Sequence, residues 1–151
     1  MKALVQRVRR AAVHVAGEPV GSIDAGLCAF IGVGHEDDAT DAETLADRLT
    51  GLRIFEDEAG KMNLSLRDTG GALLVVSQFT LMADTRRGRR PSFVAAAPPE
   101  HAEPLIEQLA STVRAGGVDV AGGRFGAHME VDICNDGPVT LMLDTREKRS
   151  G

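Results

Sequence analysis

Short apolar runs with the two-residue period of β-strands dominate this chain and outnumber its helical patterns. Turn signals at Gly17–Pro19 and Asp24–Gly26 separate the first runs, which is typical of a β-meander. Strands and helices do not alternate regularly along the sequence. We therefore expect an α/β protein of the α+β type, with a mixed, mainly antiparallel or barrel-like sheet and helices on one face. The expected strands cover residues 3–8, 11–16, 19–23, 26–33, 72–76, 118–120, 129–134 and 139–143.

Two segments show the period of amphipathic helices. Thr40–Glu43 has the pattern of a capping box, and leucines recur on one face behind it, so we expect a helix over residues 41–54. A second helix is expected to begin near Pro98–Pro99, because proline is favoured in the first turn, and to end at Gly116–Gly117. The apolar face of this second helix, which we expect in the core, consists of Ala102, Leu105, Ile106, Leu109, Ala110 and Val113.

A length of 151 residues suffices for one domain that buries its own core without disulfides or metal ions. We assign this domain to residues 1–145 and expect residues 146–151 to form a flexible tail. The four histidines lack metal-ligand spacing, and Cys28 and Cys134 lie among apolar neighbours, so we expect reduced thiols, no metal ion and no cofactor. Without a membrane-length apolar stretch or a signal-peptide pattern, the protein is predicted to be cytoplasmic.

The charge of the chain is unevenly distributed. Its formal net charge of −5 disfavours binding to polyanions through overall charge, and the absence of Trp and Tyr disfavours an aromatic platform for nucleic-acid bases. Arg86, Arg87, Arg89 and Arg90 nevertheless concentrate positive charge within five residues. This loop is either a solvated surface or a binding site for phosphate.

Two polar segments lie at the ends of expected strands, where a fold can place chemistry on a rigid support. Ser77–Thr80 follows the apolar run 72–76 and offers two hydroxyls, an amide and several backbone N–H groups. Asn135–Thr140 follows the run 129–134. Each has a plain structural interpretation, a strand end for the first and a hairpin turn for the second. If the two segments meet in space, they form a site.

The residues of these segments leave several chemistries open. A lone threonine without a neighbouring base is a poor nucleophile, so backbone amides that stabilise an oxyanion are more economical, each worth about 3 kcal/mol. About 5% of X-Pro bonds in folded proteins are cis, and a cis bond at Gly137–Pro138 would aim carbonyl oxygens into a pocket, where they could accept from an ammonium group. A cysteine paired with a histidine is a further candidate nucleophile.

Six segments stand in a characteristic order and spacing. They are Gln6–Val8, Gly60–Ser65, Ser77–Leu81, Arg90–Phe93, Gly123–Ala127 and Asn135–Thr140. Together they resemble the bacterial form of the D-aminoacyl-tRNA deacylase family, over essentially residues 1–145. The resemblance implies a hydrolase that cleaves the ester bond of D-aminoacyl-tRNA, and of mischarged glycyl-tRNA, and that forms a homodimer with its active sites at the subunit interface.

The resemblance also assigns roles to residues. Ser77, Gln78, Phe79 and Thr80 would form the catalytic segment, with the Phe79 amide near the scissile carbonyl. The set that binds the substrate and selects its chirality would be Arg7, Met129, Gly137 and Pro138. The set that meets the acceptor end of tRNA would be Arg86, Arg87, Arg89 and Arg90.

In such proteins Gly137–Pro138 would be cis and would reach into the partner subunit's pocket, where rigid backbone excludes an L side chain but admits a D residue or glycine. The resemblance suggests that the 2′-hydroxyl of the terminal adenosine assists hydrolysis, with Thr80 as nucleophile the competing proposal. Two rival functions remain. One is a noncatalytic tRNA-binding or nucleic-acid-binding module that uses residues 86–90, and the other is a hydrolase that depends on Cys28 or Cys134.

Overall fold

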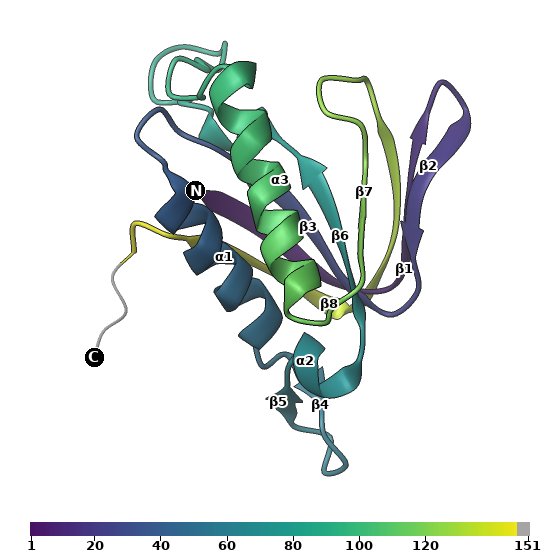
Figure 1. Cartoon of the computed structure of the whole chain (residues 1–151). Coiled ribbons are helices and arrows are strands. Elements are labelled where there is room, and N and C mark those ends of the chain that lie inside the picture. Colours follow the sequence, from purple (N-terminus) through teal and green to yellow (C-terminus); the bar gives the residue numbers. More distant parts are fainter. Residues whose placement is uncertain (148–151) are drawn as a thin grey trace.

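The computed structural model describes residues 1–147 and contains one main sheet, a small second sheet and helices (Figure 1). The strands are β1 (Lys2–Val15), β2 (Glu18–Ile23), β3 (Gly26–Gly32), β4 (Phe55–Glu56), β5 (Met62–Leu64), β6 (Ala72–Ser77), β7 (Val120–Gly122) and β8 (Glu130–Asp144). The helices are α1 (Ala39–Gly51), α2 (Leu66–Thr69), α3 (Pro99–Ala115) and the 3-10 turn η1 (Phe79–Met82).

β1 organises the main sheet. It pairs antiparallel with β8 along one edge, while its other edge pairs antiparallel with β3 and then with β2. The strands β3, β6 and β7 are parallel to one another. The chain reaches each parallel neighbour through a crossover that contains α1 or α3, as parallel pairing requires. The mixed sheet and its α/β class confirm the predicted fold.

The two long helices lie side by side on one face of the sheet (Figure 1). Leu45 of α1 and Leu109 of α3 belong to the main hydrophobic core beneath them. Successive residues of β6 point alternately into this core and into a second cluster on the other face, so Leu73 is in the first and Leu74 in the second. Burial on both faces explains why β6 is a continuous apolar run.

The sheet is nearly closed into a barrel, because the edge strands β2 and β7 approach each other. Their closest approach is at two glycines: a Cβ atom added to Gly21 would lie 2.0 Å from the carbonyl oxygen of Gly122. Real Cβ atoms do not approach a backbone oxygen so closely. The absence of a side chain at Gly21 is therefore a condition of closure.

Two pairs of predicted strands are each one strand in the structure. The runs 3–8 and 11–16 form the continuous strand β1, because β8 pairs with both halves while the opposite neighbour changes from β3 to β2. The runs 129–134 and 139–143 form β8, whose register against β1 shifts between the pairs Val8–Asn135 and Gln6–Thr140. The predicted hairpin turn is wrong: residues 136–139 are a bulge in one strand.

The helices begin and end close to their predicted bounds. α1 begins at Ala39 because Asp38, and not Thr40, is its N-cap. The Asp38 carboxylate accepts from the amides of Thr40 and Asp41 at 2.9 and 3.2 Å. The Asp41 carboxylate in turn accepts from the Asp38 amide. α1 ends at Gly51, three residues before the predicted end. α3 begins at Pro99 as predicted. No helix in residues 1–147 is long and apolar enough to cross a membrane.

The start of the predicted flexible tail is tied to the domain. The Arg146 guanidinium lies 3.2 Å from Glu36 and 3.5 Å from Asp37. Residues 148–151 of that tail lie outside the described residues.

We predict that Gly21→Ala will destabilise the fold by about 1–3 kcal/mol, because the new methyl group forces β2 away from β7. Gly122→Ala is the matched control across the same seam, since the nearest atom to its added Cβ is 3.6 Å away. Urea unfolding followed by circular dichroism measures both. Equal unfolding free energies for the two variants would contradict a tight seam.

Candidate active site

A largely apolar pocket of about 550 Å³ opens beside the end of β6. Its lining comes from four parts of the chain: the end of β3, the β6–η1 junction, the start of α3 with the segment that leads into it, and the connection between β7 and β8 with the start of β8. Size and apolar lining are those of a small-molecule site. The lining residues that bear on the chemistry are Ser77, Gln78, Phe79, Phe125, His128 and Met129.

The β6–η1 junction presents backbone N–H groups at the pocket. The Gln78 amide donates to the carbonyl of Ile31 at 2.8 Å, which ends the ladder of β6, and η1 begins at the next residue. No side chain caps η1. Within residues 1–147 the amides of Phe79 and Thr80 donate no hydrogen bond to the protein. Free amides at the start of a helical turn can bind a developing negative charge.

The predicted catalytic residues differ in where they lie. Ser77, Gln78 and Phe79 line the pocket, whereas Thr80 is exposed beside it and is not part of the lining. The Gln78 side-chain amide donates to the Thr80 hydroxyl. This contact occupies a lone pair of the oxygen and does not remove its proton, so it does not activate Thr80 as a nucleophile.

Met129 lies in the wall of the pocket, whereas Arg7, Gly137 and Pro138, with which the resemblance groups it, are not part of the lining. The position of Met129 depends on Gly123, because a Cβ atom at residue 123 would lie 2.5 Å from the Met129 sulfur. The glycine therefore leaves the space that the thioether occupies. No single motif of the sequence links these two residues, which lie on opposite sides of the β7–β8 connection.

Arg7 anchors the β8 bulge that contains Gly137 and Pro138. The Arg7 side chain is buried. Its Nε donates to the carbonyl of Asp136 at 3.1 Å, and its Nη1 donates to the carbonyl of Ile54 at 2.7 Å. The Gly137–Pro138 bond is cis, and Gly137 has a φ of +133°. Few residues other than glycine adopt such a φ.

Asn135 fixes the bulge from its other side. Its side-chain amide donates to the carbonyls of Arg7 and Val139 at 2.9 and 3.0 Å, so one side chain spans both ends of the bulge. The result is a rigidly held bulge whose tip, Gly137 and Pro138, is exposed.

The two polar segments do not meet within one chain. The pocket lining includes Ser77, Gln78 and Phe79 but no residue of 135–140. The bulge is held instead by Arg7 of β1, a strand that does not contribute to the pocket lining. The juxtaposition that would make a common site is thus absent from the single chain.

The arginine loop is closed at its base and lies next to η1 in the chain. Backbone hydrogen bonds of 2.8 and 2.9 Å join Asp84 and Ser92. The Arg86 guanidinium donates two hydrogen bonds to the Asp84 carboxylate and the Arg86 backbone amide donates a third, and together they lower the pKa of that carboxyl group to about 2. Asp84 is therefore charged at neutral pH and offsets the charge of Arg86. The remaining cations of the loop are the exposed Arg87, Arg89 and Arg90, which form no ion pair with residues 1–147.

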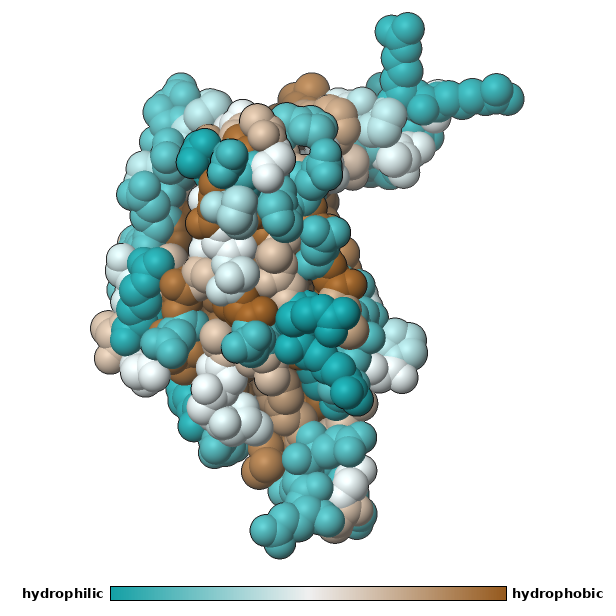
Figure 2. Space-filling view, turned by 90° about the vertical axis from the view of Figure 1, so that its right-hand side faces the viewer, coloured by the Kyte–Doolittle hydropathy of each residue, from teal (hydrophilic) through white to brown (hydrophobic). Residues whose placement is uncertain are grey.

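Phe93 is a site residue that sequence reasoning missed. Its ring packs edge-to-face on Phe79, with centroids 5.2 Å apart, and both rings are exposed, Phe79 by 59% and Phe93 by 38%. The contact joins the arginine loop to η1. Its only sequence signal was the motif Arg90–Phe93, which contributed to the family resemblance without a role. The space-filling view of Figure 2 shows further hydrophobic surface between hydrophilic side chains on the side of β1, β2 and β7.

The structure disfavours cysteine chemistry. Neither Cys28 nor Cys134 lines the pocket, and burial raises the pKa of the Cys28 thiol to about 12. A thiol with this pKa is protonated at neutral pH and is a poor nucleophile. Among the described residues 1–147, no three His, Cys, Asp or Glu side chains gather where they could hold a metal ion.

Comparisons with known proteins identify the family. The family model described as D-Tyr-tRNA(Tyr) deacylase matches residues 4–144. A D-aminoacyl-tRNA deacylase of Chloroflexus aurantiacus is 59% identical over 149 residues, covering 99% of this chain and 93% of the relative. That of Thermomicrobium roseum is 58% identical over 151 residues, covering 100% and 98%.

Solved structures agree with this result. One described as c-Myc DNA unwinding element binding protein matches with a TM-score of 0.89 at 40% identity, covering 95% of this chain and 98% of that one. A probable eukaryotic D-amino acid tRNA deacylase has the same fold, with a TM-score of 0.83 at 17% identity over 94% of this chain and 97% of that one. From the matched family model and these relatives, the chain belongs to the D-aminoacyl-tRNA deacylase family.

Proposed function

We propose that this protein hydrolyses the ester bond of D-aminoacyl-tRNA, and of mischarged glycyl-tRNA, and releases the free amino acid and tRNA in the cytoplasm. The observation that carries the proposal is that the amides of Phe79 and Thr80, which donate to no group within residues 1–147, lie beside an apolar pocket. An ester carbonyl placed there gains two donors for the oxyanion of its tetrahedral intermediate. The names of the curated relatives support the choice of ester.

The reaction needs no protein nucleophile. A water oxygen adds to the carbonyl carbon, and negative charge develops on the carbonyl oxygen, to which the Phe79 amide donates. The bond from this carbon to the ribose oxygen then breaks, and the ribose oxygen takes up the proton that the attacking water gives up, so that the products are the free amino acid and a ribose hydroxyl. No residue of Ser77–Thr80 is a general base, so we assign the orientation of the water to the neighbouring 2′-hydroxyl of the terminal adenosine. His128, an exposed residue of the lining, is the side chain at the pocket that could act as a base in its place.

Chirality is selected by rejection. Once the amino group and the carbonyl of the substrate are fixed, the hydrogen and the side chain on Cα must occupy the two remaining directions. A rigid backbone segment in one of these directions excludes an L side chain, whereas a D residue or glycine enters without contacts to its side chain. The bulge at Gly137 and Pro138 suits this role, because Arg7 and Asn135 hold it and both residues are exposed, so that their carbonyls can accept from the substrate's ammonium group.

A homodimer supplies this loop. Within one chain the loop tip and the pocket lie apart, and both are exposed. In a two-fold dimer both subunits use the same surface, so each contact between the chains occurs twice. If the bulge of one chain enters the pocket of the other, the second bulge therefore enters the first pocket. The large exposed hydrophobic residues Phe79, Phe93 and Met142, and the hydrophobic surface in Figure 2, support such a contact.

The arginine loop binds the acceptor end of tRNA in this scheme. Arg87, Arg89 and Arg90 are free to contact phosphates, whereas Arg86 is neutralised by Asp84. The edge-to-face contact of Phe93 and Phe79 fixes the base of this loop next to η1. Binding through phosphates carries no sequence information, so the loop orients tRNA without choosing among tRNAs.

A second candidate is a noncatalytic nucleic-acid-binding module that uses the same loop. It is favoured by one observation, the likeness to the 40% identical structure, which is described as a protein that binds a DNA unwinding element. The net charge of −5 counts against it, because affinity would depend on one loop.

We predict that the protein releases D-tyrosine and glycine from their tRNAs but releases L-tyrosine at least about 100-fold more slowly, a preference of about 2.8 kcal/mol. Release of labelled amino acid at equal tRNA concentrations measures it. The noncatalytic module predicts no release from any of the three. Replacement of Cys28 and Cys134 by alanine is the control: retained activity excludes the cysteine-dependent hydrolase.

We predict that Thr80→Ala retains kcat within about tenfold of the wild type, because a backbone amide is unaffected by removal of the side chain. Thr85→Ala, an exposed threonine nearby, is the matched control. A loss on the order of 10³-fold for Thr80→Ala alone would assign the nucleophile to Thr80 and reject the water mechanism.

A further inference from the structure

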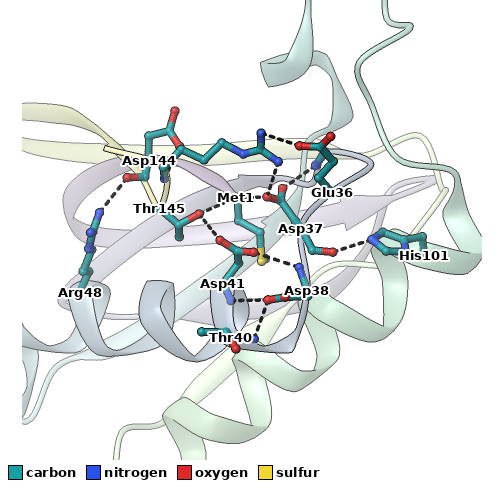
Figure 3. A network of polar contacts seen from close by, with 12 residues as sticks. Met1, Glu36, Asp37, Asp38, Thr40, Asp41, Arg48, His101, Asp144 and Thr145 are labelled. Carbon is teal, nitrogen blue, oxygen red and sulfur yellow. Dashed lines mark hydrogen bonds and ion pairs between the residues drawn. The ribbon is translucent and has the colours of Figure 1, made fainter. Parts of the chain in front are cut away.

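A buried ion pair lies at the start of β1, outside the residues that the proposed mechanism uses. The α-amino nitrogen of Met1 is 2.9 Å from Oδ1 of Asp37, and their side chains are 0% and 2% exposed. The same amine donates to the Thr145 hydroxyl at 2.7 Å (Figure 3). A buried charge is costly unless it is paired, so each partner needs the other.

The Asp37 side chain connects this pair to the wall of the pocket. Its second oxygen accepts from the Gly34 amide at 2.6 Å, and Gly34 is bridged to Ala96. Beside this bridge, the Ala97 amide donates to the carbonyl of Val33 at 2.9 Å. Val33, Ala96 and Ala97 all line the pocket. The carboxylate thus holds the turn on which one side of the pocket is built.

A second connection runs through the backbone of Asp37. Its carbonyl accepts from Nε2 of His101, at 2.7 Å, in the first turn of α3 (Figure 3). Pro99 and Ala102 of the same turn line the pocket. A shift of Asp37 therefore reaches the wall by two routes, the end of β3 and the start of α3.

Another cation near Asp37 does not replace the amine. The Arg146 guanidinium lies 3.5 Å from Oδ1, but its side chain is 55% exposed and it also pairs with Glu36 at 3.2 Å. Solvent screens such a contact, whereas the pair of Met1 and Asp37 is shielded.

We propose that the ion pair between the Met1 amine and Asp37 positions this wall of the pocket, so that full activity depends on a free, charged amine on Met1. A formyl or acetyl group on that nitrogen removes the charge and adds atoms to a fully buried site. The inference rests on the proposed function, because activity is one of its readouts. Met1 and Asp37 are positioning residues and do not contact the substrate.

The test compares full-length protein with a free Met1 amine, protein that retains an N-formyl group after expression with a deformylase inhibitor, and Asp37→Asn. Glu36→Gln is the matched control. Glu36 is the residue before Asp37, its carboxylate also pairs with Arg146, and its own side chain is 82% exposed. For each, kcat and KM with D-tyrosyl-tRNA are measured at 20 °C, together with hydrogen exchange of the Ala97 amide and of the Val75 amide in β6.

We expect the formyl group and Asp37→Asn each to lower kcat/KM by roughly tenfold, since a small displacement of a binding wall has effects of this size. Exchange at Ala97 should accelerate while exchange at Val75 does not change. Glu36→Gln should stay within about twofold. Because the two changes break one contact, their combination should cost less than the product of the separate losses.

Formylated protein with the kcat/KM and the Ala97 exchange of the free-amine form overturns the proposal. So does a Glu36→Gln variant as impaired as Asp37→Asn, or a formylated chain that fails to fold at 20 °C, since the pair would then hold the whole fold and not the wall. If the free-amine protein releases no amino acid, the proposed function fails, and the exchange comparison alone decides whether the pair holds the wall.

Discussion

The structure depends on the backbone hydrogen bonds of β1, which pairs with three other strands. β8 occupies one edge along nearly its whole length, and β3 and β2 share the other. A strand with both edges satisfied is a fixed reference for whatever projects from it. The Met1 amine at its start and Arg7 in its middle both take their positions from this strand. The closure of the barrel follows as well, because β2 is brought to β7 from the second half of β1.

The proposed site is divided into two halves by this arrangement. The pocket is lined by the ends of β3 and β6, the start of α3 and the β7–β8 connection. The β8 bulge that contains Gly137 is held instead by Arg7 of β1. In the proposed reaction each half contributes rigid backbone: amides at η1 and carbonyls at the bulge. Such a site suits a substrate whose own hydroxyl group, here the 2′-hydroxyl of the terminal adenosine, orients the attacking water. It also explains why selection by shape, and not by side-chain recognition, is the economical proposal.

The hydrophobic period and the spacing of turn signals predicted the fold class and both long helices, because these patterns are local in the sequence. The family resemblance predicted Ser77–Thr80 and Met129 as site residues, and all of these except Thr80 line the pocket. The same patterns misread β1 and β8 as pairs of strands, since Arg9 and Arg10 interrupt the apolar run and Asn135–Pro138 resembles a turn. Only pairing with a distant strand keeps the chain extended. The cap of α1 was misplaced by two residues because Asp38 and Thr40 are both good caps. Phe93 and Asp37 could not be found, because their roles arise from contacts with Phe79 and Met1 that are remote in sequence or formed only in the fold.

The central claim is that the loop of one chain completes the pocket of another, and mixing two inactive variants tests it most directly. Met129→Lys fills the pocket, and Gly137→Ala distorts the loop, since its Cβ would lie 2.7 Å from the Val139 side chain. Each should be inactive alone on D-tyrosyl-tRNA. After denaturation and refolding together, half of the dimers would carry one intact site of two, so the account predicts recovery of about a quarter of wild-type activity. A mixture as inactive as its parents, while each variant remains folded and dimeric, would contradict it.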